Sequence, residues 1–307
     1  MKKFLFVIIF ILLIALSSCG DKLQEESYYS FTDSNGYTVN LSEKPQKVAV
    51  LFSSYVEMWT LAGGETYVTV GESIERGFVN KDTLLVDTGA GKSINYELLI
   101  SYKPDFVICS SDIAVQIEVA SFLRNNNIPC ASFKVENFDD YLWVLNILTD
   151  ITGQKENYRV YGADIKSNID TLLNKTVNNE QKKILFIRAS SSAKSTKAKT
   201  ADEHFVALML KELGTYNIAE NVPVLLDGLS AEEIIKENPN YIFISTMGDF
   251  EKAQNYIYSL FETDTYKNLD AVKNGNYCFL EKDLYQFKPN HRWYEAYLNL
   301  WEILYEE

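Results

Sequence analysis

The sequence predicts an α/β fold of two lobes, each with a central and mostly parallel sheet, joined by one long rigid α-helix. Three observations predict this fold. Strand-like and helix-like segments alternate from residue 44 onward, as they do in parallel sheets that are covered by helices. The order of these segments recurs in the second half of the chain. A proline-free helical segment separates the two copies.

The first lobe is predicted to span residues 44–154. Gly63 and Gly64 indicate where its first helix ends, because glycine readily takes the left-handed conformation found at helix ends. Apolar runs distinguish its strands, and apolar residues at helical spacing distinguish its helices. The strands are predicted at 47–52, 67–71, 105–109 and 130–133, and the helices at 56–63, 94–101 and 115–126.

The second lobe is predicted to span residues 179–307 and to repeat the order of the first. The closest match pairs residues 97–111 with 232–246, where a helix ends before a proline and a β-rich run follows. The second copy also carries a serine- and lysine-rich insertion at 189–202. Between the lobes, residues 155–178 have apolar side chains at helical spacing. They predict one connecting helix of roughly 30 Å, and therefore little hinge bending.

The N-terminus predicts export and a lipid anchor. Two lysines precede an apolar run at residues 4–16, which is too short to span a membrane comfortably. Small residues then precede Cys19, in a pattern that looks like a bacterial lipobox. We expect residues 1–18 to be a lipoprotein signal peptide, with Cys19 lipidated on the extracytoplasmic face of the cell membrane. Residues 19–43 would form a tether and a small edge element. A plain secretory signal with a coincidental cysteine is the alternative.

Charge and cysteine content exclude several classes of function. The net charge of −13 disfavours nucleic acid as a partner, because nucleic-acid binding needs a basic footprint. Cys109, Cys130 and Cys278 are interpreted as buried free thiols, with a Cys109–Cys130 disulfide left open. The chain has two histidines and lacks spaced Cys/His clusters, so neither a structural zinc site nor a free metal ion as ligand is expected.

Four motifs, in order behind the lipobox, carry a resemblance to a known family. They are "SSYVEMWTLAGG", "SINYELLISYKPDFVICSS", "LSAEEIIKENPNYIFISTMGD" and "KPNHRWYEAYLNLWEILY", and they cover about residues 44–305. The chain resembles the helical-backbone periplasmic binding proteins that serve ABC importers of siderophores, haem and cobalamin. The resemblance implies a monomeric, non-enzymatic binding protein without a cofactor. It would capture an iron chelate in a cleft between the two lobes and deliver it to a permease dimer with its ATPase. A ferric siderophore is the first expectation, and haem or cobalamin is the alternative.

The resemblance also implies that each lobe presents one glutamate to the permease. Glu57 is assigned to this role in the first lobe and Glu232 in the second, with Glu233 as the next choice. A carboxylate near the start of a helix is stabilised by the helix dipole, so it can be held for an arginine fork. The alternative is that these glutamates only cap their helices.

The ligand site is predicted from strand ends, because ligands of α/β lobes bind beyond the carboxyl ends of the strands. Arg188 is the clearest candidate, since it ends an apolar strand, and the lysines of the following insertion predict an anionic ligand. A mobile, solvated insertion is the alternative. Aromatic side chains could stack on a chelator, although Trp293 equally fits a core stripe. Iron ligation by His204 is a minor expectation. The predicted ligand-binding residues are Ser53, Ser54, Tyr55, Arg76, Ser110, Ser111, Arg188, Lys197, Lys199, His204, Met247, Tyr285, Arg292 and Trp293.

Two other classes of protein are weaker interpretations of the same sequence. A surface lipoprotein hydrolase would be expected to carry a GxSxG or HExxH motif, and the sequence has neither. A lipoprotein receptor for a protein partner does not account for the paired lobes.

Overall fold

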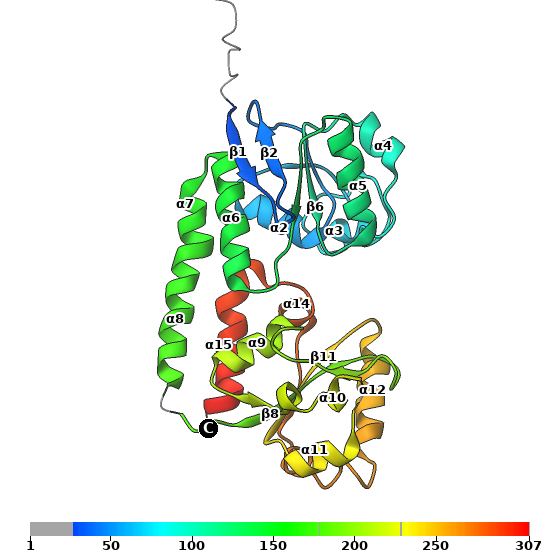
Figure 1. Cartoon of the computed structure of the whole chain (residues 1–307), viewed down its shortest axis with the longest axis vertical. Coiled ribbons are helices and arrows are strands. Elements are labelled where there is room, and N and C mark those ends of the chain that lie inside the picture. The colour runs from blue at the N-terminus through cyan, green and yellow to red at the C-terminus, as the bar shows by residue number, and fades with distance from the viewer. Residues whose placement is uncertain (1–26, 178, 228, 307) are drawn as a thin grey trace, which may run out of the picture.

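The structure is a computed structural model that describes residues 27–177, 179–227 and 229–306. Cys19 and the predicted signal peptide lie outside these residues. The two lobes are stacked along the longest axis, and a long helix runs along one side of both (Figure 1). The predicted fold class is confirmed, because each lobe has a five-stranded and mainly parallel sheet.

The N-terminal lobe contains a fully parallel sheet with the strand order β5-β4-β3-β6-β7. Its strands are β3 (Val48–Val50), β4 (Thr66–Thr69), β5 (Leu84–Leu85), β6 (Phe106–Ser110) and β7 (Cys130–Phe133). Its helices are α2 (Ser53–Leu61), α3 (Gly71–Glu75), α4 (Tyr96–Ser101), α5 (Ala114–Asn125) and α6 (Phe138–Thr152).

The C-terminal lobe repeats this plan with the order β10-β8-β11-β12, and the short β9 pairs antiparallel with β8. Its strands are β8 (Lys183–Ala189), β9 (Lys197–Ala198), β10 (Tyr216–Asn217), β11 (Tyr241–Thr246) and β12 (Tyr277–Phe279). Its helices are α9 (Phe205–Glu212), α10 (Val224–Asp227), α11 (Ala231–Glu237), α12 (Phe250–Phe261), α13 (Asp270–Lys273), α14 (Lys282–Tyr285) and α15 (Trp293–Tyr305), with 3-10 turns at Ile218–Asn221 (η2) and Asn290–Arg292 (η3).

A two-stranded hairpin precedes the first lobe. Strands β1 (Tyr29–Thr32) and β2 (Thr38–Leu41) pair antiparallel. The ring of Phe31 stacks 6.1 Å from that of Phe133, which places the hairpin on the N-terminal sheet. The buried carboxylate of Asp33 then accepts a charge-assisted hydrogen bond of 2.9 Å from Arg124. Part of the segment interpreted as a tether and edge element is therefore packed structure.

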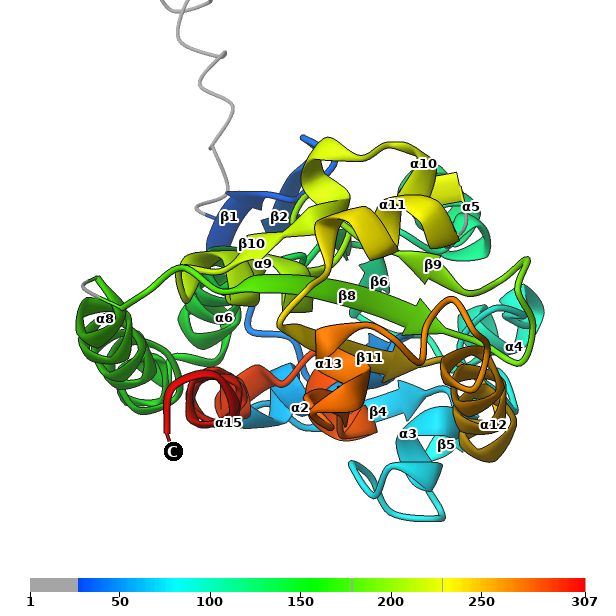
Figure 2. The same ribbon diagram turned by 90° about the horizontal axis from the view of Figure 1, so that it is seen from below.

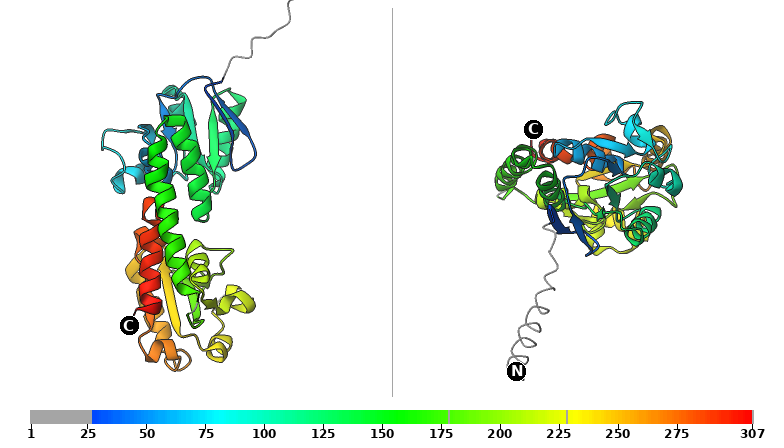
Figure 3. Two further views of the ribbon diagram at one scale, coloured as in Figure 1. Left: turned by 90° about the vertical axis from the view of Figure 1, so that its left-hand side faces the viewer. Right: turned by 90° about the horizontal axis from the view of Figure 1, so that it is seen from above.

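The connection between the lobes is a continuous helix made of α7 (Lys155–Tyr158), a π turn η1 (Arg159–Ala163) and α8 (Asp164–Thr176). A π turn leaves a backbone carbonyl without its usual helical partner. Here the Tyr141 hydroxyl donates to the carbonyl of Tyr161 at 2.8 Å. A Cβ at Gly162 would lie 3.0 Å from a Leu142 methyl, so glycine allows this helix to approach α6 closely. Figure 3 shows the long helix beside both α6 and α15.

One hydrophobic core passes from lobe to lobe. It joins the face of the N-terminal sheet beneath α2 and α6 to the C-terminal face beneath α9 and α15. Two separate cores fill the other face of each sheet. Figure 2, seen from below, shows β8 and β11 of the C-terminal sheet between α11 on one side and α15 on the other. The shared core fixes how the lobes face each other, and thereby shapes the space between them.

Candidate functional site

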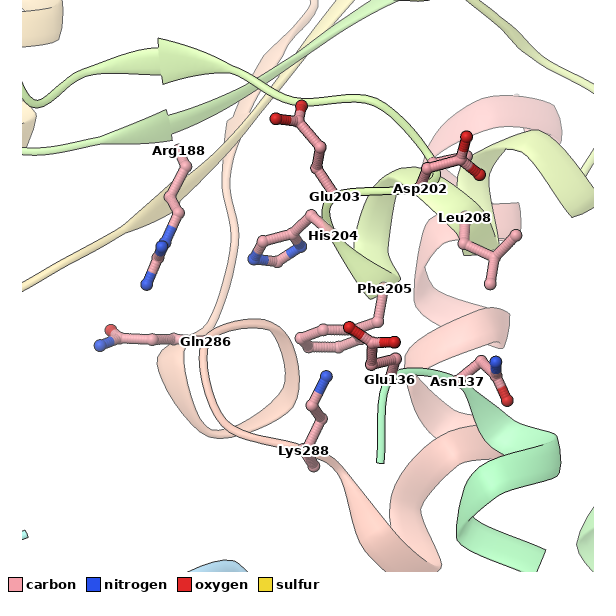
Figure 4. A pocket seen from close by; sticks show the side chains of 11 residues that line it. Glu136, Asn137, Arg188, Asp202, Glu203, His204, Phe205, Leu208, Gln286 and Lys288 are labelled. Atoms are coloured by element: carbon pink, nitrogen blue, oxygen red, sulfur yellow. The ribbon is translucent and has the colours of Figure 1, made fainter. Parts of the chain in front are cut away.

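The cavity between the lobes that contains Arg188 has a volume of about 400 Å³. We call it the Arg188 cavity. Glu136 and Asn137 reach it from the loop after β7, Arg188 and His204 come from the C-terminal sheet and the start of α9, and Lys288 comes from the segment after α14 (Figure 4). It therefore lies beyond the carboxyl ends of strands from both lobes, where the sequence placed the ligand site.

Arg188 is positioned by the pairing of its strand, β8, with β9. Its flanking residues in β8 are buried while its side chain is half-exposed, and it lies opposite Lys197 of β9 in antiparallel register. Side chains of directly opposed residues share one face of a sheet, so two cations lie side by side. Burial lowers the pKa of Arg188 from its ordinary value. Among the described residues, no carboxylate forms an ion pair with it. The guanidinium is thus available to an anion.

Lys288 is a second cation in this cavity, and it was not among the predicted ligand-binding residues. Its ammonium lies 4.4 Å above the ring of Phe205. Burial lowers its pKa to about 8, although the carboxylates of Glu136, Asp112 and Asp140 favour its charged form. In the sequence it is an ordinary lysine before a proline. Lys288 reaches the cavity because residues 286–290 run back to the first lobe, which the sequence does not show.

His204 is the N-cap of α9. Its Nδ1 accepts a hydrogen bond of 3.2 Å from the backbone N–H of Val206. Its ring lies 4.9 Å from the rings of both Phe186 and Phe205. Burial and the nearby cations lower its pKa to about 3, so the imidazole is neutral at physiological pH. His204 therefore caps its helix, and its ring also lines the cavity.

The carboxylates at this cavity are mostly engaged by other groups. Glu203 accepts from Thr200 N–H and pairs with Lys199 at 3.1 Å, and Glu136 pairs with Lys134 at 2.7 Å. Lys199 is therefore largely neutralised by its neighbour. The predicted insertion is not simply a solvated loop, because β9 and the buried Thr196 tie it to β8.

A second cavity of about 450 Å³ lies on the other side of Lys288, which lines both. We call it the Arg76 cavity. The Arg76 guanidinium lies 4.5 Å from the ring of Phe78 and 4.1 Å from the ring of Phe287 across the lobe boundary. Arg292 also lines this cavity, but it pairs with Glu295 at 2.7 Å.

Several predicted ligand contacts are instead structural. Tyr55 is buried and donates to the carbonyl of Phe133 at 2.7 Å, and Tyr285 is buried and donates to that of Ala296 at 3.0 Å. Trp293 is fully buried, with its ring 5.8 Å from that of Phe138. A ring at a helix start can point inward as well as towards the cleft. The structure therefore contradicts stacking of these three on a ligand.

The predicted serines and the predicted methionine also do not line either cavity. Ser53 and Ser54 are buried, and their hydroxyls accept from Arg76 at 3.1 and 3.2 Å, so they position the arginine. Ser110 is buried too and accepts from the backbone N–H of Asp112. Ser111 and Met247 are half-buried at strand ends but line neither cavity. All four serines are thus off the cavity surfaces.

The assignment of Glu57 to a free outer surface is wrong. Its side chain is only 16% exposed, and its carboxylate faces the other lobe. Oε2 accepts a 2.7 Å hydrogen bond from Asn290 Nδ2, and Oε1 lies 3.1 Å from His291 Nδ1. Glu57 therefore joins α2 to η3. The sequence alone does not show whether a glutamate at a helix start faces inward or outward, because this depends on how the helix packs.

Glu232 differs from Glu57, because it is exposed in the first turn of α11. Its counterpart in the first lobe is Glu97, which is exposed in the first turn of α4. Both helices lead directly into the strand that pairs with the first strand of the sheet, β6 with β3 and β11 with β8. The repeat of 97–111 in 232–246 already aligned these two glutamates.

Other features of the described residues limit the chemistry. No group of three or more potential metal-ligating side chains occurs within residues 27–177, 179–227 and 229–306. Over the same ranges, no helix is both long and apolar enough to cross a membrane. Cys109 and Cys130 are buried free thiols, as favoured from the sequence, whereas the free thiol Cys278 is only half-buried.

Comparison with known proteins agrees with this architecture. The Periplasmic binding protein family model matches residues 48–284. No curated protein matches the chain significantly. A solved structure of a possible iron-binding, periplasmic solute-binding protein from Staphylococcus epidermidis has a TM-score of 0.69 at 20% identity, covering 86% of this chain and 100% of that one.

Two solved complexes from Staphylococcus aureus have the same fold. IsdE complexed with heme has a TM-score of 0.67 at 16% identity, covering 85% of this chain and 100% of that one. SirA complexed with staphyloferrin B has a TM-score of 0.66 at 18% identity, covering 91% and 97%. The match of the family model extends over most of the sequence and includes strands of both lobes. The chain therefore belongs to the Periplasmic binding protein family.

Proposed function

We propose that this chain is the substrate-binding protein of an ABC importer and that it captures an anionic metal chelate between its lobes, with a ferric siderophore as the first candidate. The observation that carries the proposal is the Arg188 cavity. It presents a guanidinium without a carboxylate partner among the described residues, in a protein whose net charge is −13. Such a cation is costly to bury unless a ligand supplies the counter-charge.

The solved structures of similar fold support an iron chelate, since their ligands include staphyloferrin B in SirA and haem in IsdE. Haem or a corrin is the second candidate ligand. Cys19 would anchor the protein to the membrane, and the protein would act as a monomer that meets a permease dimer and its ATPase. Membership of a family of binding proteins accounts for the lack of an enzymatic motif.

For the permease we propose Glu232 together with Glu97, in place of Glu57. Both carboxylates are exposed at equivalent helix starts, where the helix dipole stabilises them. One turn later, each helix also exposes an isoleucine, Ile100 at 37% and Ile235 at 48%. A carboxylate beside an apolar side chain, repeated on both lobes, suits a partner made of two equivalent subunits.

The ligand hypothesis is tested with Arg188→Gln. Ferric chelates of the hydroxycarboxylate, catecholate and hydroxamate types, and haemin, would be titrated against the purified protein by fluorescence quenching. For the chelate that binds, we expect affinity to fall roughly 10- to 100-fold, because charge-assisted hydrogen bonds contribute about 1.5–3 kcal/mol each. Arg292→Gln is the matched control, since that guanidinium is already paired with Glu295. Equal affinity for both variants and the wild type would remove Arg188 from the site.

Lys288 predicts how binding depends on pH. Its pKa of about 8 means that the ammonium is charged below this pH and loses its proton as the pH rises through it. An anionic chelate binds the charged form better, so its affinity should fall between about pH 7.5 and 9. Lys288→Met should bind more weakly at pH 7 and show no such fall. Isothermal titration over this range provides the measurement, and a flat wild-type profile would contradict the prediction.

A further inference from the structure

We propose that His204 donates a hydrogen bond from Nε2 to an anionic oxygen of the ligand, and that its helix-capping bond prevents it from ligating iron. This inference rests on the proposed function and defines the chemistry of the ligand more closely. It selects a chelate whose metal is saturated by its own donor atoms and which presents carboxylate or similar oxygens to the protein.

The tautomer of His204 follows from its cap. The backbone N–H of Val206 can only donate, so the Nδ1 atom that it contacts at 3.2 Å must be unprotonated. In a neutral imidazole the proton is then on Nε2. Figure 4 shows one ring nitrogen directed back to the helix and the other directed into the cavity, towards the side of Arg188. The group that faces the ligand is therefore an N–H donor.

The alternative tautomer is unfavourable for a structural reason. A proton on Nδ1 would meet the Val206 N–H, leaving two donors facing each other at the start of α9. The helix would lose its N-cap, and a buried donor would be left without an acceptor, both of which are destabilising. Rotation of the ring is opposed by its contacts with Phe186 and Phe205. An Nε2 lone pair, which a metal would need, is thus disfavoured by the fold itself.

The groups around His204 also favour an anionic oxygen over a metal ion. The side chains of Arg188, His204 and Lys288 extend from three different segments into one space (Figure 4). None of these groups, in the protonation states described, offers an acceptor to the ligand. A metal ion would meet two positive charges here, whereas a carboxylate or phenolate oxygen would meet three donors. The low pKa of His204 agrees with a donor that adds no charge of its own.

Two substitutions distinguish the capping role of Nδ1 from the donor role of Nε2. His204→Asn keeps a cap acceptor near the Nδ1 position but lacks the donor that reaches the cavity. His204→Gln places an amide N–H near the Nε2 position. With ferric citrate as the probe, at a temperature where all three proteins are folded, we expect His204→Asn to weaken binding about tenfold and His204→Gln to stay within about threefold of the wild type. Wild-type affinity in His204→Asn would overturn the proposal.

A measurement without ligand tests the tautomer separately. Long-range ¹H–¹⁵N correlation spectra of the purified protein should show Nε2 protonated and Nδ1 unprotonated for the histidine whose signals vanish in His204→Gln. A protonated Nδ1 would overturn the proposal. With haemin, the Soret band should be the same in the wild type and in His204→Asn, and a band that depends on His204 would also overturn it. If the wild type binds none of the ferric chelates named above and no haemin but shows the expected tautomer, the proposed function fails and the assignment of the donor stands.

Discussion

Replacing Glu97 and Glu232 together by lysine is expected to stop uptake of the chelate in cells while leaving its affinity in solution unchanged. Both side chains are exposed and line neither inter-lobe cavity. In the proposed complex each would meet a basic group of one permease subunit. Removing one partner of such a buried pair costs on the order of 2–5 kcal/mol, and reversing its sign adds repulsion. Uptake of labelled chelate and chelate-stimulated ATPase activity would be measured on the same variants.

The matched control is Glu118→Lys, which makes the same change on the exposed face of α5. Each single variant should retain part of the uptake, and the double variant should be the most impaired. Normal uptake in the double variant would place the docking surface elsewhere. A parallel loss of chelate affinity would instead assign these glutamates to the ligand site.

Replacing Asn290 by aspartate is expected to destabilise the protein by about 3–5 kcal/mol, the range for an uncompensated buried charge. Asn290 is fully buried, and its Nδ2 donates both to Glu57 Oε2 at 2.7 Å and to the carbonyl of Ser54 at 3.1 Å. A carboxylate of the same shape cannot donate and would bring a second negative charge to Glu57. Denaturant unfolding of the two proteins at neutral pH gives the difference.

Glu57→Gln is the informative companion to this variant. A glutamine carbonyl still accepts from Asn290, so only the charge assistance is lost and we expect a cost nearer 1 kcal/mol. The double variant should recover part of the loss of Asn290→Asp, because the amide can donate to the new carboxylate. An Asn290→Asp protein as stable as the wild type would show that the contact between α2 and η3 contributes little.

The alternation of strands and helices was readable from the sequence because it depends on local periodicity. The predicted strand at 130–133 coincides with β7, and the predicted helix at 115–126 differs from α5 by one residue at each end. The hairpin strand Tyr29–Thr32 was not predicted, since its four residues alternate only between half-buried and exposed. Its position depends on packing against Phe133, which is far away in the sequence.

The residues of the candidate site were predictable only at strand ends, because there the strand determines where a side chain points. Arg188 was assigned to the candidate site because it follows a run of buried residues in β8, and its side chain lines the Arg188 cavity. Tyr55 and Trp293 were misassigned, because at a helix start the direction of a side chain depends on how the helix is rotated. Lys288 and Asn290 lie in a segment between helices that has no periodicity of its own. Their roles arise from the contact between two lobes, which no local pattern encodes.

The segment around Asn290 has a mechanical consequence. Besides the shared hydrophobic core, the lobes are joined at two separate places, by the connecting helix and by the contact of η3 with α2. A body fastened at two points cannot swing about either one, so opening by rotation would first have to break the buried Asn290–Glu57 hydrogen bond. Exchange of ligand then depends on side chains that line the Arg188 cavity, such as Gln286 and Lys288. Such rearrangements occur in nanoseconds, far faster than the microseconds to milliseconds of domain closure. Occupancy would be communicated to a partner by local changes of surface rather than by a change of overall shape.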